Sequence, residues 1–301
     1  MPPRPPRPAI SGVNPVSAFF ATLLVRAVAA LSERARVRLA SLVAGLVWTL
    51  RIRRRVTMDN LTAALPASSV EERVRIAKGA YRSMALGVVE ALAGVRQDPS
   101  ELDRKVEVEN WSAIEPSLRS GKGVLVATAH FGNWELLGEV MARRGVRLAA
   151  VVKPLKGAVN AKLVEARQQA GLQLILARGA LKATLKALGE GYTVAMLVDQ
   201  VLPAKHGVFV PFFGRPACTN PALSVAAQRT GAPVFVAMGA REGEKIRVFI
   251  EGPFAMPDTG DRDRDVREHT AQITSAIERY IRKYPDQWLW LHRRWKVQPE
   301  R

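Results

Sequence analysis

The hydrophobic and polar positions along the chain change their period after the first hundred residues. Residues 16–31 and 39–50 are largely apolar. Residues 60–95 follow a helical spacing, with a charged first turn behind a Ser68/Ser69 cap. Short runs of aliphatic and β-branched residues then alternate with helix-like segments. This change of period predicts a helical beginning followed by a body of strands and helices.

The body contains β-rich runs at 124–128, 148–152, 172–176 and 193–198, with helix-like segments at 134–144, 158–169 and 180–188. Residues 234–239 and 246–251 predict two more strands paired as a hairpin, and an amphipathic helix follows the polar loop 258–265. Strands joined by helices pair in parallel, because the crossover returns the chain to the same edge of the sheet. The expected fold class is therefore α/β, with a largely parallel central sheet flanked by helices.

The N-terminal region differs from the body. We expect residues 1–60 to be a disordered basic lead-in followed by membrane-associated helices, and residues 61–301 to be a single α/β domain. Neither apolar segment reaches cleanly the ~20 apolar residues that span a bilayer. A signal peptide, a single spanning helix with Arg26 snorkelling, and an interfacial helical hairpin compete. We favour the hairpin, with Ser32 capping its second helix, because Arg26 interrupts the apolar core of a signal peptide.

The charge of the chain points to an anionic partner. Its 301 residues carry a formal net charge of +18, from 45 basic and 27 acidic residues. Nucleic acid, an anionic membrane or an acidic protein would suit this charge, and an arginine-rich composition without a partner is the alternative. No zinc-ligand spacing, RNP-like aromatic motif or helix-turn-helix pattern is present, so we do not expect nucleic acid. The arginines at 51, 53, 54 and 55 follow an apolar segment, which suits anionic headgroups on the cytoplasmic side.

Cys218 is the single cysteine of the sequence. An intrachain disulfide and a cysteine-based zinc site are therefore excluded, and the usage is typical of a reducing compartment. We expect neither a metal nor a resident cofactor.

The main chemical candidate lies in the stretch GKGVLVATAHFGNWELLGEV, residues 121–140. His130 follows a predicted strand, Gly132 and Asn133 supply a turn, and Glu135 falls in the first turn of the next helix. Functional groups collect at the carboxyl ends of parallel strands. A carboxylate that accepts from one ring nitrogen fixes the tautomer and leaves the other nitrogen as a base. The alternative is a histidine bonded to the backbone, with Glu135 serving only the helix dipole.

Four blocks of the sequence resemble the bacterial lipid A biosynthesis late acyltransferases, also called lauroyl/myristoyl acyltransferases, which are distant relatives of the glycerolipid acyltransferases. They are HFGNWE with its His-x4-Glu spacing, VDQVLPAKHGVFVPFFGRPACT at 198–219, YPDQWLWLHRRWK at 284–296, and MDNLTAALPASSVEERVRIA at 58–77. The resemblance covers nearly the whole chain.

This resemblance implies a glycerolipid-acyltransferase-like fold and the transfer of a fatty acyl chain from a thioester to a hydroxyl of a glycolipid. Acyl carrier protein, or CoA, would carry the acyl group as co-substrate. The reaction would take place at the cytoplasmic face of the inner membrane. It implies that His130 is the general base and Glu135 its orienting partner. Arg167 and Arg178 match family arginines and would contact a phosphate on the acceptor or on the carrier arm.

Other residues are expected to bind substrate. Asp199 and Gln200 end a predicted strand and would line the crevice that holds His130. Backbone amides around Phe131–Asn133, or a nearby arginine, would stabilise the oxyanion. Lys153, followed by Pro154, stands where the family often has Arg-Pro. That difference keeps the charge but loses bidentate geometry and weakens any inference about the acceptor.

Two aromatic blocks complete the candidate site. Phe212, Phe213 and Gly214 form either a packed loop or a wall that contacts lipid. The tryptophans at 288, 290 and 295 are either core residues or an interfacial belt. His292, Arg293 and Arg294 are predicted to bind phosphates or anionic headgroups.

We therefore expect an acyltransferase that acts on a lipid A precursor. An acyltransferase for another membrane lipid, such as a mannosylated phosphoinositide or a lysophospholipid, would use the same motif. A non-catalytic basic protein bound to membrane or nucleic acid is the remaining alternative.

Overall fold

The computed structural model describes residues 14–93, 104–153 and 157–299. Its α-helices are α1 (Pro15–Ala30), α2 (Glu33–Thr49), α3 (Arg54–Ala64), α4 (Val70–Ala93), α6 (Trp111–Arg119), α7 (Trp134–Arg143), α8 (Ala158–Gln169), α9 (Ala180–Gly189), α10 (Ala222–Thr230) and α11 (Arg262–Lys283). The basic lead-in predicted for residues 1–10 and Pro154 lie outside the described residues.

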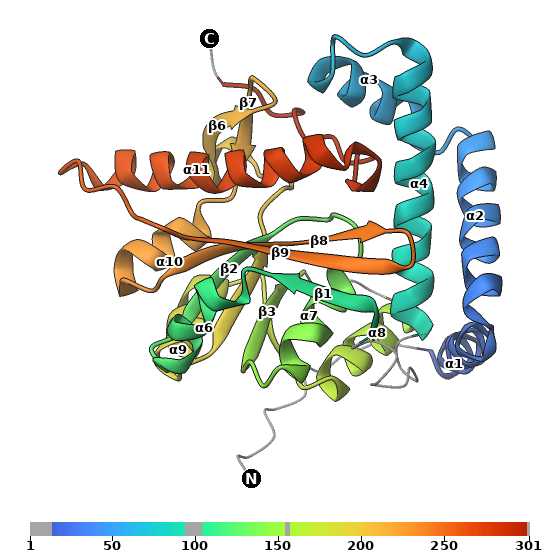
Figure 1. The fold of residues 1–301 in the computed structure, drawn as a ribbon, viewed down its shortest axis with the longest axis horizontal. Helices are drawn as coiled ribbons and strands as arrows, with labels where there is room; N and C mark the ends of the chain where they lie inside the picture. Colours follow the sequence, from blue (N-terminus) through green and yellow to red (C-terminus); the bar gives the residue numbers. More distant parts are fainter. Residues whose placement is uncertain (1–13, 94–103, 154–156, 300–301) are drawn as a thin grey trace.

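Among the described residues, a seven-stranded sheet with the order β1-β9-β8-β2-β5-β3-β4 forms the centre of the molecule (Figure 1). Its strands are β1 (Val106–Glu109), β2 (Val124–Thr128), β3 (Leu148–Val152), β4 (Gln173–Leu176), β5 (Thr193–Leu197), β8 (Val234–Glu242) and β9 (Lys245–Phe254). Strands β8, β2, β5, β3 and β4 pair in parallel. Strand β9 is antiparallel to β8, and β1 pairs in parallel with β9. The predicted α/β class with a largely parallel sheet is confirmed.

Helices cover both faces of the sheet, because alternate side chains of each strand point in opposite directions. Leu125 and Ala127 of β2 belong to the core cluster that includes residues of α9, α10 and α11. Val124 and Val126 belong to the cluster with residues of α6 and α7. Figure 1 shows α10 and α11 on one side of the sheet and α6 and α7 on the other. All five residues of β2 are buried, as a central parallel strand requires.

Most predicted strands and helices agree with the structure to within a residue. The predicted strands 124–128 and 148–152 and the helix 158–169 are reproduced without change, and 234–239 with 246–251 form the hairpin β8–β9. The helical pattern at 60–95 is divided, because α3 ends before the segment that holds Pro66 and α4 begins after the Ser69 cap. The sequence pattern did not predict β1, α6, α10 or the separate hairpin of β6 (Val208–Phe212) and β7 (Arg215–Thr219).

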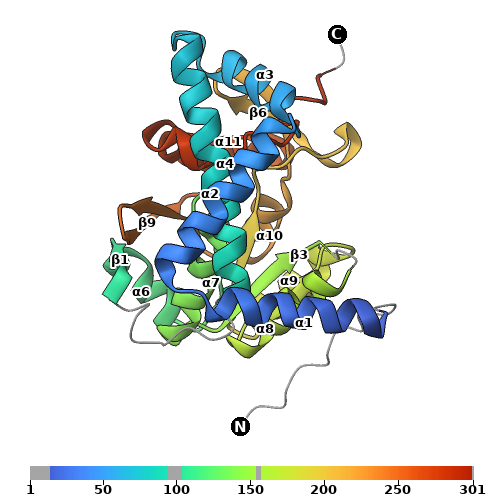
Figure 2. The same cartoon turned by 90° about the vertical axis from the view of Figure 1, so that its right-hand side faces the viewer.

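Helices α1 and α2 are the two helices predicted for the N-terminal region, but they do not pack side by side as a hairpin: α1 contacts α4 and α8, and α2 contacts α4. The hydroxyl oxygen of Ser32 accepts a hydrogen bond from the amide of Ala35 at 3.3 Å, so Ser32 is the N-cap of α2. The guanidinium of Arg36 donates to the carbonyl oxygens of Val28 and Ala29 and ties α2 to the end of α1. Figure 2 shows both helices on the outside of α4, and α2 packs along α4.

No helix within the described ranges is sufficiently long and apolar to cross a membrane. Helix α3 runs across residue 60, where the sequence predicts a domain boundary. The side chain of Asn60 donates to the carbonyl oxygens of Trp290 and His292. The end of the predicted N-terminal segment is therefore bonded directly to the C-terminal block.

Candidate active site

His130 and Asp199 come together because their strands are neighbours. Strands β2 and β5 pair in parallel, with Thr128 opposite Leu197, so the residues that follow both strands leave the same edge of the sheet. His130 Nδ1 lies 2.8 Å from Asp199 Oδ1, and the backbone amide of His130 donates to Asp199 Oδ2 at 3.0 Å. The indole of Trp288 donates to the same Oδ2 at 2.9 Å.

The charges of this pair fix the state of the imidazole. Burial opposes ionisation of Asp199, but the charge of His130 and hydrogen bonds from His130 and Trp288 outweigh it and lower the pKa of Asp199 to about 2. Burial also opposes protonation of His130, yet ionised Asp199 raises the pKa of His130 above its usual value. An ionised carboxylate only accepts, so neutral His130 carries its proton on Nδ1 and keeps a basic lone pair on Nε2.

The free nitrogen of His130 faces Gln200. Gln200 Nε2 lies 3.3 Å from His130 Nε2, so the amide donates to the basic nitrogen in this tautomer. The ring of Trp134 meets the imidazole edge-on, with the centroids 5.3 Å apart. The His130 side chain is 23% exposed, so the base is screened but reachable.

Glu135, the partner expected for His130, is bonded elsewhere. Its carboxylate forms a bidentate pair with Arg167 of α8, at 2.5 Å to Nη2 and 2.8 Å to Nε, and accepts from the indole of Trp134. The prediction that Glu135 is hydrogen-bonded to the ring is wrong, because the first turn of α7 directs this side chain toward α8. Glu135 still favours the imidazolium through its charge.

The turn after His130 is held by the C-terminal block. The amide of Gly132 donates to the carbonyl oxygen of Gln287 at 2.8 Å, and the amide of Leu289 donates to the carbonyl oxygen of His130 at 3.1 Å. Gly132 has a φ of +52°, and a Cβ there would lie 2.0 Å from the carbonyl oxygen of Gly239. Only glycine fits this position.

Two of the amides expected to bind the oxyanion are already used. The amide of Phe131 donates to the carbonyl oxygen of Ala129 at 2.8 Å, and that of Gly132 is bonded to Gln287. The prediction is therefore wrong for these two groups.

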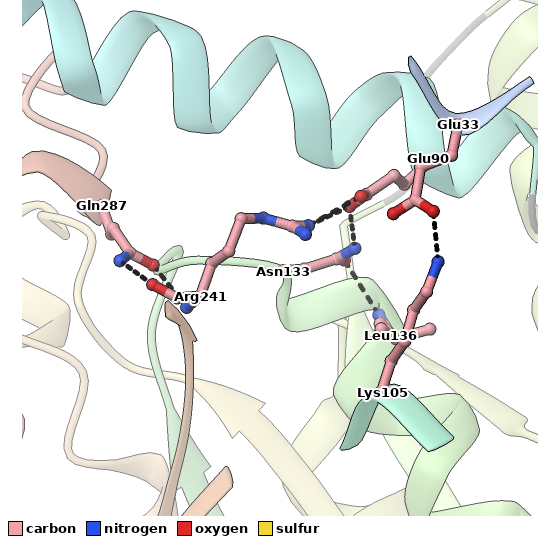
Figure 3. A network of polar contacts seen from close by, with 7 residues as sticks. All are labelled: Glu33, Glu90, Lys105, Asn133, Leu136, Arg241 and Gln287. Carbon is pink, nitrogen blue, oxygen red and sulfur yellow. Dashed lines mark hydrogen bonds and ion pairs between the residues drawn. The ribbon is translucent and has the colours of Figure 1, made fainter. Parts of the chain in front are cut away.

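A buried ionic network fixes Asn133 on the other side of the turn (Figure 3). The Asn133 side chain accepts from the amide of Leu136, so it caps α7, and donates to Glu90 Oε2 at 2.6 Å. Arg241 donates to both oxygens of Glu90, at 2.7 and 2.5 Å. Gln287 completes the chain, because its carboxamide is bonded to the amide and the carbonyl oxygen of Arg241. Burial raises the pKa of Glu90, and Arg241 and Asn133 oppose that shift.

A cavity of about 470 Å³ adjoins this network, between α2, α4, α7 and α8. Its lining includes Glu90, Asn133, Glu135, Arg167 and Arg241, but His130 is not among the described residues that line it. The site thus has two sides. The sheet side holds His130 and Asp199, and the helix side, which faces this cavity, holds Glu90, Glu135 and Arg167.

Lys153 and Arg178 are exposed and follow β3 and β4, so they lie at the sheet edge from which His130 also leaves. At the tip of the β6–β7 hairpin the two phenylalanines are buried, whereas Gly214 is exposed. Phe212 and Phe213 pack against Trp288, and Gly214 completes the two-residue turn. Trp290 and Trp295 also contact Phe213. These aromatic residues are core, rather than a lipid-contacting wall or an interfacial belt.

The three basic residues near the C-terminus differ in exposure. Arg294 is fully buried, donates to Cys218 O and Thr219 Oγ1, and lies over Phe212. Burial lowers the pKa of Arg294 to about 10. Its predicted binding of a ligand phosphate is wrong, because the side chain is fully buried and bonded to the β7 strand. Arg293 is exposed and His292 is half-buried. Burial lowers the pKa of His292, whose ring interacts electrostatically with the His130–Asp199 pair.

Glu90, Arg241 and Gln287 were not identified as functional residues from the sequence. Gln287 lies inside the quoted C-terminal block, which is the signal that could have found it. Glu90 and Arg241 carry no local signal, because each is one charged residue among many in its helix or strand. Asp199 was placed at the site but not as the partner of His130.

A carboxylate-oriented histidine at the carboxyl edge of an α/β sheet is an arrangement that suits general-base catalysis. The model of the family described as bacterial lipid A biosynthesis acyltransferase matches residues 11–297. The chain belongs to this family, and it is an acyltransferase.

Similar proteins with established names come from several bacteria. The chain is 27% identical to the lipid A biosynthesis palmitoleoyltransferase of Escherichia coli over 83% of its own length and 81% of that protein. It is 26% identical to the E. coli lipid A biosynthesis lauroyltransferase, over 82% and 80% of the two chains. It is 24% identical to the phosphatidylinositol mannoside acyltransferase of Mycolicibacterium smegmatis, over 76% and 74%.

Proposed function

We propose that this acyltransferase moves a fatty acyl chain from an acyl thioester, carried by acyl carrier protein, to a hydroxyl of a lipid A precursor at the cytoplasmic face of the inner membrane. The observation that carries the proposal is the His130–Asp199 pair, which leaves a basic Nε2 at the sheet edge. The names of the relatives supply the substrate class, because most of those cited above act in lipid A biosynthesis.

The reaction needs a base and no enzyme nucleophile. His130 Nε2 takes the proton of the acceptor hydroxyl while its oxygen attacks the thioester carbon. The imidazolium is stabilised by Asp199, whose charge it neutralises. When the tetrahedral intermediate collapses, the C–S bond breaks and the proton on Nε2 neutralises the leaving thiolate. The base therefore returns to its starting state in each cycle.

A transfer assay with the purified full chain tests this function. Acyl-carrier-protein and CoA thioesters would be crossed with a lipid A precursor and a phosphatidylinositol mannoside as acceptors. We expect transfer from acyl carrier protein to the lipid A precursor, and no transfer by His130→Ala. His206→Ala is the matched control, because His206 is exposed on a short 3-10 helix. An active and folded His130→Ala protein would contradict the mechanism.

The phosphatidylinositol mannoside acyltransferase is the reason to keep a second acceptor. Both acceptors are anionic glycolipids that carry hydroxyl groups, and the base chemistry is the same for each. Faster transfer to the mannoside than to the lipid A precursor would support this second function. Mass spectrometry of the lipids of a deletion strain gives the same distinction in the cell.

Membrane association is part of the proposal, and the N-terminal helices α1 and α2 support it. The exposed apolar side chains are Val16, Phe19, Phe20, Leu23 and Leu24 of α1 and Leu42, Val43, Leu46 and Leu50 of α2. Their spacing of three and four places them on one face of each helix. An arginine turn, residues 51–55, follows α2, and its Arg51, Arg53 and Arg55 are exposed. An apolar face beside cationic groups suits the interface of an anionic bilayer.

Vesicle sedimentation tests the docking surface. We expect the full chain to bind vesicles that contain anionic lipid, and the double variant Phe19→Ser/Leu23→Ser to bind less. Val70→Ser is the matched control, because Val70 is equally exposed at the start of α4. Equal loss of binding in the control would show that the apolar face of α1 is not the membrane-binding surface.

A further inference from the structure

The transfer leaves one chemical requirement without an assigned group. When the hydroxyl attacks, the thioester carbonyl oxygen becomes an oxyanion, which needs hydrogen-bond donors within about 3 Å. Those donors must lie close to His130 Nε2, because the attacking oxygen is held between this nitrogen and the thioester carbon.

Four hydrogen-bond donors of the turn are committed to the fold. The amide of His130 donates to Asp199, that of Phe131 donates to the carbonyl oxygen of Ala129, and that of Gly132 donates to Gln287. The carboxamide of Asn133 is also engaged, because it donates to Glu90. Recruiting any of these donors would break a bond that holds the turn.

Gln200 is placed differently. Its carboxamide nitrogen lies 3.3 Å from His130 Nε2, and its backbone follows Asp199, which is fixed by three hydrogen bonds. The position of Gln200 next to the base is therefore set by the same strand that orients the base. The contact with Nε2 occupies the place where an acceptor hydroxyl must enter, so the hydroxyl displaces the carboxamide, whose N–H groups then become available a few ångströms away.

We infer that Gln200 is a catalytic residue, and that its carboxamide donates to the oxyanion of the thioester carbonyl once the acceptor hydroxyl has taken its place on His130 Nε2. The inference rests on the proposed function and deepens it. During attack, the hydroxyl proton moves to His130, the C–O bond forms, and the carbonyl π electrons move to the oxygen bonded to Gln200. During collapse, that electron pair returns, the C–S bond breaks, and the thiolate takes the proton from His130.

Steady-state kinetics of Gln200→Met and Gln200→Glu test the inference. Methionine keeps the length of the side chain and removes the donor, so kcat falls by about 100- to 1000-fold with little change in KM for the thioester. Gln228→Met is the matched control, because Gln228 is a half-buried glutamine of α10 that donates to the carbonyl oxygen of Arg262, and its kcat stays at the wild-type value.

The glutamate variant gives a second signature that does not depend on kcat alone. A carboxylate beside Nε2 favours the imidazolium and raises the pKa of His130, so the acid limb of the kcat/KM profile moves to higher pH. Thermal unfolding at the wild-type temperature shows that the variants are folded.

The outcomes separate this inference from the proposed function. If the wild type transfers acyl groups and folded Gln200→Met keeps kcat within about tenfold of it, the inference is overturned and the donors lie elsewhere, such as the first turn of α7. A rise in KM with unchanged kcat overturns it as well, because Gln200 would then only bind substrate. If the wild type itself fails to transfer in the same assay, the proposed function has failed instead.

Discussion

The two sides of the turn that begins α7 carry carboxylates in different surroundings. On the sheet side, Asp199 is buried and bonded to His130 and Trp288. On the helix side, Glu135 is about one-fifth exposed and paired with Arg167 beside the cavity. Glu135 is near His130 in the sequence, and Asp199 is not. The difference teaches that the neighbouring strand, rather than the next helical turn, supplies the partner of a histidine at a strand end.

The largest effect is expected on the sheet side, from Asp199→Asn. The amide cannot hold the Nδ1 proton as a carboxylate does, so the base loses its tautomer and kcat falls by about 10³- to 10⁴-fold. Glu135→Gln is the matched variant on the helix side and should lose far less. Steady-state kinetics measure both. Equal losses of kcat would indicate that Glu135 also orients His130, as the sequence predicts.

The network of Glu90 on the helix side is expected to affect folding more than chemistry. Glu90→Ala leaves Arg241 and Asn133 without their partner, which costs about 3 kcal/mol of unfolding free energy, at the low end for a broken buried pair because both charges are partly exposed. Urea unfolding measures the loss. Glu139→Ala removes a helical i,i+4 pair that lines the same cavity and should cost about 0.3–0.5 kcal/mol. Similar losses of unfolding free energy for both variants would show that the Glu90 network stabilises the fold no more than an ordinary helical ion pair does.

The pH dependence of stability should come mainly from the sheet side. The folded-state pKa of Asp199 is depressed from 3.8 to about 2, so its contribution of about 2 kcal/mol is present above pH 3.8 and is lost as the pH falls toward 2. The folded-state pKa of His130 is raised, so its contribution is present below 6.5 and is lost as the pH rises through the folded value. The unfolding free energies of wild type and Asp199→Asn should therefore differ most between about pH 4 and 6.5. A difference that does not vary with pH would refute the coupling.

Apart from the control Glu139→Ala, the smallest effect is expected from the Glu135–Arg167 pair on the helix side. A double-mutant cycle of Glu135→Gln and Arg167→Met should give a coupling of about 1 kcal/mol in stability, because both groups are partly exposed. A coupling near zero would make the pair a surface contact. A coupling of several kcal/mol would show that the Glu135–Arg167 pair stabilises the fold as much as the His130–Asp199 pair does.

Much of the fold could be predicted, because β2 and β3 are short continuous apolar runs and glycines mark many of the helix exits. Strand β1 was missed since it has only four residues, although its alternation of valine and glutamate is typical of a half-buried edge strand. The β6–β7 hairpin is not predictable from the sequence, because its turn places Phe213 at a φ of +52°, which phenylalanine rarely adopts. The aromatic core around Trp288 holds that residue there.

By itself, the sequence determined which residues are chemically available: a histidine after a buried strand, a capped helix behind it, and the blocks that place the chain in its family. The pairing of these residues was decided by tertiary structure. Strand order brought Asp199 to His130 across 69 positions and sent Glu135 to Arg167. Burial turned Arg294 from a candidate ligand-binding group into a core residue. The physical reason is that a hydrogen bond or ion pair depends on distance and desolvation in space, and periodicity along a chain reports only which face of its own helix or strand a residue occupies.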